Sequence, residues 1–175
     1  MTTVAERVQQ SLRAIPDYPK PGIMFQDITP VLRDGPLFRD VVVDMCRPFL
    51  HRRITHVMGI EARGFILGGA IAVELGAGFV PARKPGKLPW DRATEIYDLE
   101  YGSDSLEAHR DALSPGNQVL VVDDVLATGG TAKAAGQLAR GLGAEVVGWS
   151  FLLEIGVLQG RERLIGAPCY IVARC

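Results

Sequence analysis

The sequence predicts an α/β fold with a Rossmann-like parallel sheet flanked by helices. Between residues 36 and 141, short apolar runs typical of buried strands alternate with helical segments, which is typical of a parallel sheet. Two of these strands, 55–60 and 119–122, lead directly into glycine-containing loops and then into helices. Ligands bind such folds at the carboxyl ends of the strands, near a topological switch. We therefore expect both loops to form one site.

Length and composition fit a single domain covering residues 1–175. A hydrophobic content of 47% excludes disorder, and a net charge of −1 argues against nucleic-acid or membrane partners. Neither a spanning apolar run nor a signal peptide is expected. Cys46, Cys169 and Cys175 show no metal-ligand spacing. We interpret them as free thiols in a reducing cytoplasm.

The N-terminal region combines a predicted helix with a proline-rich extended segment. Apolar residues recur at helical spacing over residues 3–14 and predict an amphipathic helix, whereas four prolines favour an extended chain over 17–30. The centre of that segment carries Met24, Phe25 and Gln26. Phe25 either packs in the core or stacks on a flat base whose edge meets neighbouring backbone groups. The residues alone favour the core.

The first strand–loop–helix junction follows a predicted helix over 36–50, disturbed near Pro48. The strand 55–60 ends in the loop 61–65, and a helix continues to Leu75. Arg63 lies in this loop, and its guanidinium suits bidentate phosphate binding. A surface ion pair between Arg63 and Glu61 is the alternative.

A basic loop and a hairpin come next. The strand 78–83 leads into Arg83, Lys84 and Lys87, which are separated by proline and glycine. This loop is either a mobile lid over an anionic substrate or a solvated cluster of cations. Alternating residues over 93–100, a turn at 101–104 and a return at 105–109 predict a hairpin.

Residues 119–131, with the sequence VLVVDDVLATGGT, form the second junction. Gly129 and Gly130 allow the backbone to approach a ligand closely. The hydroxyls of Thr128 and Thr131 and the N–H groups at the start of the following helix favour a phosphate. Asp123 and Asp124 repel phosphate but suit sugar hydroxyls, or a divalent cation held through water. The pattern predicts a site for a ribose 5-phosphate.

The remaining elements complete the sheet. We expect a helix over 132–140 that ends near Gly141, an interior strand over 145–153, a helical turn over 158–164 and a closing strand over 169–173.

Four stretches together resemble the type I phosphoribosyltransferase family, and within it the adenine-specific branch, over about residues 4–170. They are residues 17–28 (DYPKPGIMFQDI), 59–65 (GIEARGF), 83–89 (RKPGKLP) and 119–131. The resemblance implies a small N-terminal hood of about residues 1–33 on a core of residues 34–175 that binds phosphoribosyl pyrophosphate (PRPP). The implied reaction converts adenine and PRPP into AMP and pyrophosphate, with Mg²⁺ carried by PRPP, in a cytoplasmic homodimer.

Residue roles follow from the same resemblance. Phe25 becomes the adenine-stacking residue, flanked by Met24 and Gln26, although family members commonly have Arg or Lys in place of Gln26. Arg63 and the loop cations become pyrophosphate ligands. Glu100 and Tyr101 belong to a mobile catalytic loop, and Glu100 is the candidate for moving the base proton. The phosphate loop contributes its whole length: Ala127, Thr128, Gly129, Gly130 and Thr131.

Two alternatives remain open at this point. A phosphoribosyltransferase for another base or for orotate would keep residues 119–131 and differ in the 22–28 segment. A regulatory protein that binds PRPP without turnover would need an effector surface, and neither an appended domain nor a basic charge balance is apparent in the sequence.

Overall fold

The computed structural model describes residues 2–98 and 103–175. Its central sheet contains the parallel strands β3 (His56–Ile60), β4 (Gly78–Ala82), β7 (Gln118–Leu126), β8 (Glu145–Glu154) and β9 (Cys169–Arg174), in the order β4-β3-β7-β8-β9. From β3 the next strand, β4, is added on one side of the sheet, whereas from β7 the strands β8 and β9 are added on the other side. The predicted α/β fold is therefore confirmed, and its topological switch lies between the two strands that carry the predicted loops.

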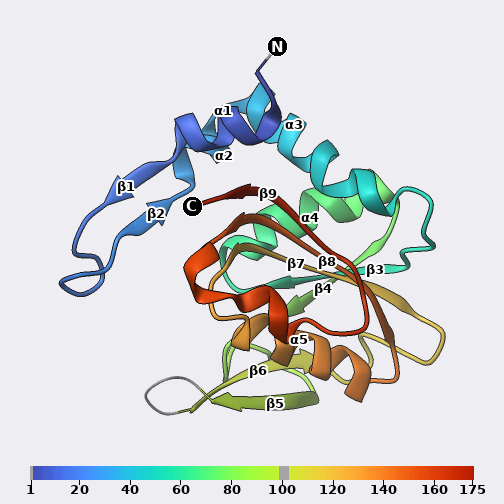
Figure 1. Cartoon of the computed structure of the whole chain (residues 1–175). Coiled ribbons are helices and arrows are strands. Elements are labelled where there is room, and N and C mark those ends of the chain that lie inside the picture. Colours follow the sequence, from blue (N-terminus) through green and yellow to red (C-terminus); the bar gives the residue numbers. More distant parts are fainter. Residues whose placement is uncertain (1, 99–102) are drawn as a thin grey trace.

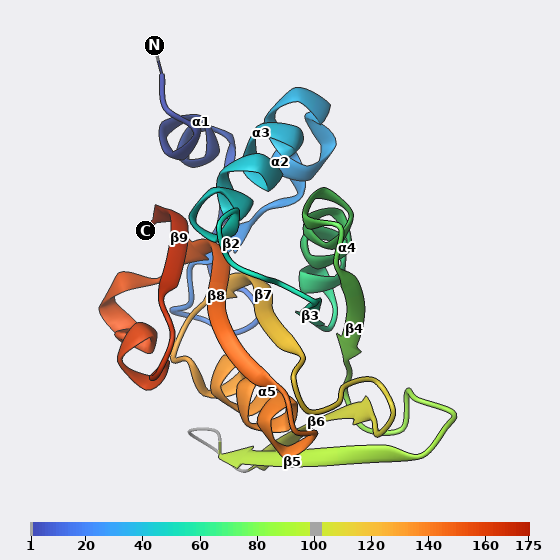
Figure 2. The ribbon, with the colours of Figure 1, turned by 90° about the vertical axis from the view of Figure 1, so that its right-hand side faces the viewer.

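Helices cover both faces of the sheet (Figure 1). On one face, α1 (Val4–Ser11), α3 (Gly35–Cys46) and α4 (Arg63–Leu75) enclose one hydrophobic core. On the other, α5 (Gly130–Gly141) and the antiparallel hairpin of β5 (Arg92–Asp98) and β6 (Ser103–His109) enclose a second. The view turned by 90° shows the hairpin lying along the outer side of α5 (Figure 2). The predicted hairpin is confirmed, but the predicted turn at 101–104 extends too far, because Ser103 and Asp104 already belong to β6.

One glycine allows helix α5 to pack closely against the sheet. A Cβ on Gly136 would lie 2.3 Å from the indole of Trp149, a β8 residue that is 1% exposed. Small residues dominate the buried face of the helix, namely Ala132, Ala134, Ala135 and Ala139. The middle of α5 therefore packs closely against β8.

The N-terminal prediction is partly wrong. The helix ends at Ser11, because Leu12 is already extended, and Arg13–Ile15 forms β1, which pairs antiparallel with β2 (Phe25–Asp27). Pairing with β2 gives the backbone of residues 13–15 hydrogen bonds in place of those that a longer helix would have formed. The proline-rich segment is also less extended than expected, since α2 (Thr29–Arg33) begins within it. Pro30 is tolerated there because it lies in the first helical turn.

The predicted strand 119–122 is too short. Strand β7 continues to Leu126 and so includes both Asp123 and Asp124. Its pairing with β8 extends to Leu126 opposite Glu154. Successive strand residues point to opposite faces, so the two carboxylates have different neighbours although both line the same pocket.

The remaining elements are short connections, and the thiols are free. Turns η1 (Arg47–Phe49), η2 (Gly156–Leu158) and η3 (Gly160–Arg163) are 3-10 helices. Cys46, Cys169 and Cys175 are not paired. Burial raises the pKa of Cys46 to about 12 and that of Cys169 to about 11, so both thiols stay protonated. Within the described ranges, no helix is long and apolar enough to cross a bilayer.

Candidate active site

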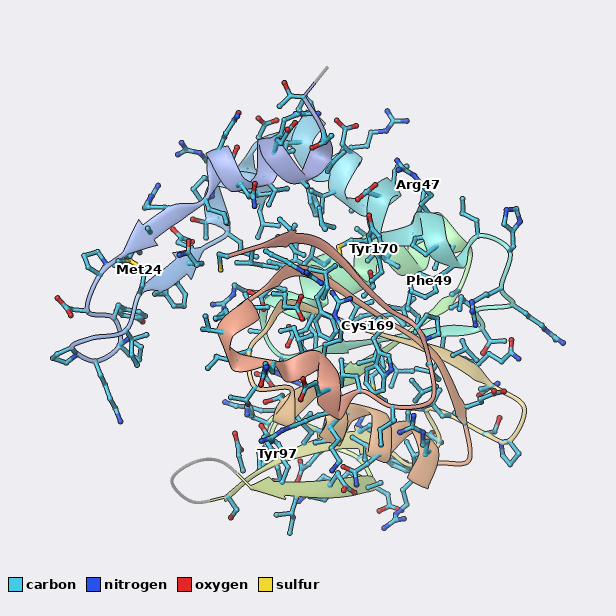
Figure 3. All side chains as sticks on the ribbon, viewed as in Figure 1. Met24, Arg47, Phe49, Tyr97, Cys169 and Tyr170 are labelled. Carbon is cyan, nitrogen blue, oxygen red and sulfur yellow. The ribbon has the colours of Figure 1, made fainter. Side chains whose placement is uncertain are left out.

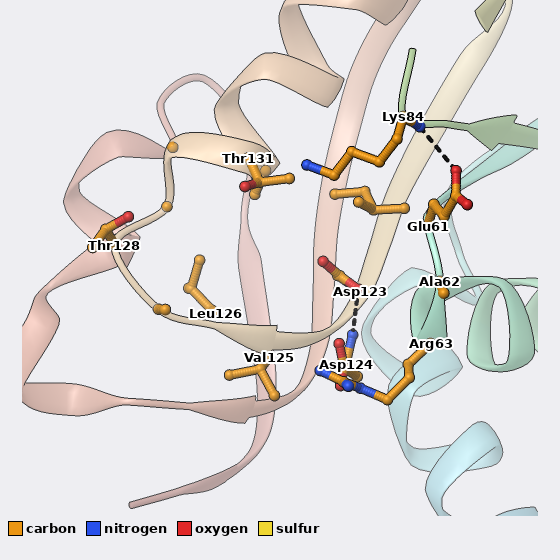
Figure 4. Close-up of a pocket in the computed structure, with 15 residues that line it drawn as sticks. Glu61, Ala62, Arg63, Lys84, Asp123, Asp124, Val125, Leu126, Thr128 and Thr131 are labelled. Carbon is orange, nitrogen blue, oxygen red and sulfur yellow. Dashed lines mark hydrogen bonds and ion pairs between the residues drawn. The ribbon is translucent and has the colours of Figure 1, made fainter. Parts of the chain in front are cut away.

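A cleft of about 470 Å³ opens at the switch point, between the ends of β3 and β7 and the start of α5 (Figure 4). Nearly all of its walls come from the two predicted loops and their flanking residues. The predicted site residues that line it are Arg63, Lys84, Asp123, Asp124, Ala127, Thr128, Gly129, Gly130 and Thr131. The structure therefore brings most of the predicted residues together, although they are separated by up to 68 positions in the sequence (63 to 131).

The phosphate loop (residues 127–131) crosses from β7 to the N-terminus of α5. Gly129 is the N-cap of this helix, with φ = 80° and ψ = 0°, a left-handed conformation that favours glycine. The N–H groups of the first helical turn have no partner within the helix, and the helix dipole favours an anion. The loop and the first turn of α5 thus form one concave surface with donors for a phosphate.

The two carboxylates of β7 have different surroundings. Asp123 points toward Thr131 and Lys84, and Asp124 points toward Arg63 (Figure 4). Burial and the neighbouring charge of Asp124 raise the pKa of Asp123, and Arg63 opposes this only in part. Gly64 permits the close approach of α4, because a Cβ there would lie 2.7 Å from Asp123 Oδ1. A polar or cationic ligand that reached Asp123 would favour its ionised form.

Arg63 forms an ion pair with Asp124, not with Glu61. The alternative interpretation of Arg63, a surface pair with Glu61, is therefore wrong. Burial acts against the charge of Arg63, but the hydrogen bond and charge of Asp124 raise its pKa. The guanidinium carbon also lies 5.5 Å from the centre of the Phe25 ring. Arg63 thus connects the acidic strand end to the N-terminal hairpin.

Glu61 instead binds the start of the basic loop. It accepts hydrogen bonds from the Lys84 backbone N–H at 2.8 Å and from Arg83 Nε at 3.3 Å. Partial desolvation works against its charge, yet the Lys84 N–H and Arg83 lower the pKa of Glu61. Arg83 also donates to the carbonyl of Lys87, whose side chain is exposed. The beginning of the loop is therefore anchored, so it is not simply a solvated cluster of cations.

Sequence reasoning missed a polar network that joins this loop to the phosphate loop. Lys84 Nζ forms an ion pair with Asp104 and donates to the Tyr97 hydroxyl at 3.0 Å. The hydroxyls of Tyr97 and Thr131 are 3.3 Å apart. Desolvation opposes the charge of Lys84, but Asp104 and Tyr97 raise its pKa. Tyr97 and Asp104 face each other across the hairpin, a pairing that the predicted turn at 101–104 concealed.

The hairpin of β1 and β2 carries the predicted base-binding segment. Phe25 is half-buried and packs outside both hydrophobic cores: its ring meets Tyr18 edge-on at 5.1 Å and lies beside Arg63. Gln26 is half-buried in β2, and Met24, just before that strand, is 54% exposed and lies far from the central sheet (Figure 3). Phe25 is therefore not a core residue. Glu100 and Tyr101 lie outside the described residues, and their expected catalytic roles stay predictions.

Comparison with known proteins gives consistent matches. A family model described as the phosphoribosyl transferase domain matches residues 47–163. The adenine phosphoribosyltransferase of Myxococcus xanthus is 56% identical over 93% of this chain and 89% of its own length. The crystal structure of the Rhodothermus marinus adenine phosphoribosyltransferase covers 98% of both chains with 51% identity and a TM-score of 0.94. The Saccharomyces cerevisiae enzyme, complexed with an imino-altritol bisphosphate and adenine, has 38% identity and a TM-score of 0.90, with 97% and 98% coverage.

These observations define the protein as a phosphoribosyltransferase. They are the order of the strands in the sheet, the cleft at the topological switch, the phosphate loop and the match to the family model. The relatives cited here, which match over nine-tenths of the chain, are adenine phosphoribosyltransferases. The chain belongs to the adenine phosphoribosyltransferase family.

Proposed function

We propose that this protein transfers the 5-phosphoribosyl group from PRPP to adenine, giving AMP and pyrophosphate, and so salvages a purine base. The observation that carries the proposal is the cleft itself. One wall is a helix N-terminus with a glycine loop, suited to a phosphate, and the facing wall carries two carboxylates, suited to ribose hydroxyls.

The phosphate loop is proposed to bind the 5-phosphate. Thr128 and Thr131 supply hydroxyl donors, and Ala127, Gly129 and Gly130 expose backbone. Asp123 and Asp124 are proposed to hold the ribose hydroxyls. Since Asp124 is ion-paired with Arg63, bound ribose would compete for that carboxylate and release the guanidinium toward pyrophosphate, whose charge it suits.

The proposed chemistry requires charge stabilisation rather than a covalent nucleophile. As pyrophosphate leaves C1 of the ribose, positive charge develops on the ring and negative charge on the leaving oxygens. Arg63 and Lys84 line the cleft and can stabilise the leaving group, while Arg83 and Lys87 lie along the same basic loop. Asp123 would lie below the ribose ring, where its negative potential would stabilise the positive charge that develops on the ring. Closure of the loop would exclude water from the activated ribose.

Magnesium is the proposed cofactor, and it would arrive with PRPP. Among the residues that the structure describes, no cluster of three or more His, Cys, Asp or Glu side chains forms a metal site. Asp123 and Asp124 offer carboxylates on the wall of the cleft and fit a cation held through water. When bound, Mg²⁺ neutralises the oxygens of the leaving pyrophosphate.

The N-terminal hood, about residues 1–33, is proposed to hold adenine over the core of residues 34–175. Phe25 would stack on the base, with Met24 and Gln26 beside it. Strand β2 pairs with β1 on one edge only, within the chain as described. Its other edge therefore keeps backbone donors and acceptors for the edge of the base. The family resemblance further supports a cytoplasmic homodimer.

A base panel tests this function. Purified protein is incubated with PRPP, Mg²⁺ and adenine, hypoxanthine, guanine or orotate, and pyrophosphate release is measured. Adenine and hypoxanthine present reversed donor and acceptor patterns at N1 and C6, so two buried mismatches cost about 2–6 kcal/mol, or roughly 30-fold to 10⁴-fold in kcat/KM. If 6-oxopurines come within about tenfold of adenine, the assignment to adenine fails. PRPP binding without turnover of any base would favour a regulatory protein instead.

A further inference from the structure

The phosphate loop rests on a segment that lies outside both predicted loops. After β8, the chain forms the short turns η2 and η3, and η3 packs against α5. Figure 1 shows these turns in orange-red beside the start of α5. The contact joins Gly129 of the phosphate loop to Gly160, about 30 positions away in the sequence.

The contact is backbone against backbone, with no room for a methyl group. A Cβ on Gly160 would lie 2.1 Å from the carbonyl oxygen of Ala127 and 2.9 Å from the amide nitrogen of Gly129. In the other direction, a Cβ on Gly129 would lie 2.3 Å from the carbonyl oxygen of Gly160. Because backbone cannot rotate away as a side chain can, the position of Gly160 sets where the loop lies.

An ion pair between a buried carboxylate and a partly exposed arginine holds Gly160 in place. Glu154 ends β8 opposite Leu126, the last residue of β7 before the phosphate loop, and is 5% exposed. It accepts two hydrogen bonds from Arg161, at 3.2 Å from Nε and 3.1 Å from Nη2. This paired geometry fixes the guanidinium in both distance and orientation. Arg161 is the next residue after Gly160, so the pair fixes the backbone that supports the loop.

We propose that Glu154 and Arg161, acting through Gly160, are positioning residues for binding of the 5-phosphate. We call these three residues the brace. The inference rests on the proposed function, in which residues 127–131 bind that phosphate. The brace acts only through the loop, so it should govern affinity for ligands that carry the 5-phosphate and leave the affinity for adenine unchanged.

The first test compares two arginines that bind the same carboxylate. Arg174 reaches Glu154 Oε2 from β9 at 2.8 Å, but it lies on a different strand from the segment that carries Gly160. We expect Arg161→Ala to raise KM for PRPP and Kd for AMP about tenfold or more, with KM for adenine changed by less than about twofold. Arg174→Ala should lower Tm comparably and leave all three constants near wild type. If Arg161→Ala and Arg174→Ala change the affinities for PRPP and AMP equally, the proposed role of the brace is wrong, because Glu154 would then only stabilise the fold.

The second test uses a matched pair of glycines. Gly160→Ala places a methyl group against Ala127 and Gly129, whereas a Cβ on Gly156 in the preceding turn meets its nearest atom, the Cys175 carbonyl oxygen, at 3.8 Å. We expect Gly160→Ala to weaken AMP binding in calorimetry at least as much as Arg161→Ala, and Gly156→Ala to preserve it. If Gly160→Ala does not fold, the arginine comparison still decides.

The wild-type protein separates the two possible failures. If it makes no AMP from adenine and PRPP, the proposed function fails. If it does, and both Arg161→Ala and a folded Gly160→Ala bind AMP like wild type, the brace fails and the proposed function stands.

Discussion

Replacing Asp124 by Asn removes one negative charge from the cleft and preserves the shape of the side chain. The Asp124 side chain is 6% exposed, while that of its partner Arg63 is 44% exposed. Because the guanidinium still reaches water, the ion pair is screened, and we expect the free energy of unfolding to fall by no more than about 1 kcal/mol. The substitution should therefore leave a folded protein.

Catalysis should suffer much more than stability. A hydrogen bond from a ribose hydroxyl to an ionised carboxylate contributes about 1.5–3 kcal/mol, more than one between neutral groups. Its loss lowers kcat/KM for PRPP by about one to two decades. Initial rates at saturating adenine measure this ratio, and urea denaturation of the same preparation measures stability.

A surface ion pair supplies the control. Asp40 pairs with Arg7 between α3 and α1, with side chains 46% and 36% exposed. Asp40→Asn should leave kcat/KM unchanged. If Asp124→Asn also stays within about twofold of wild type, Asp124 has no role in holding the ribose.

Three further predictions concern the phosphate loop, the base and the second carboxylate. Thr131→Ala loses one donor and should weaken AMP binding about two- to tenfold in calorimetry, and Gly130→Val should weaken it more, since a branched side chain enters the loop; wild-type affinity in the valine variant would contradict a phosphate site. Phe25→Ala should lower kcat/KM for every base without improving hypoxanthine relative to adenine, because stacking ignores the hydrogen-bonding pattern; a selective loss for adenine would refute this role. Burial and Asp124 raise the pKa of Asp123 above its ordinary value of 3.8, so its contribution to stability is full below that value and is lost as pH rises through the raised pKa. Asp123→Asn should therefore be more stable than wild type in urea at about pH 7 but not at about pH 3, while losing activity; equal stability at both pH values would contradict the raised pKa.

The features that sequence reasoning predicted well are local ones. The apolar run of β7, its acidic end and the glycines that follow are contiguous, so the strand–loop–helix junction could be recognised without knowing the fold. The rule that ligands bind at strand ends then placed Arg63 and Thr131 in one site, because their strands became neighbours in the sheet.

The features of the site that could not be predicted depend on contacts between residues that lie far apart in the sequence. The ion pair considered for Arg63 was one with Glu61, two residues away, but Arg63 pairs with Asp124, 61 residues away. This choice follows from β7 continuing past Val122, which turns Asp124 toward α4. The network of Lys84, Tyr97 and Asp104 likewise requires the register of the hairpin, which alternation alone does not specify.

Strand β1 was missed for a related reason. Residues 13–15 are too few to show a strand period of their own, and Ile15 also fits the helical spacing of the preceding residues. They become a strand only by pairing with residues 25–27. Sequence pattern is a weak guide where an element owes its conformation to a distant partner.

Because Trp149 packs closely on Gly136, its fluorescence can report on the position of helix α5. The chain has two tryptophans: Trp149 is 1% exposed against α5, and Trp90 is 66% exposed. Their emission should differ in wavelength, and a soluble quencher should reach Trp90 first. In a Trp90→Phe protein, the remaining tryptophan fluorescence comes from an indole packed on the helix whose N-terminus forms part of the proposed phosphate site. Any shift of that helix as substrate enters would then be visible in real time without a label.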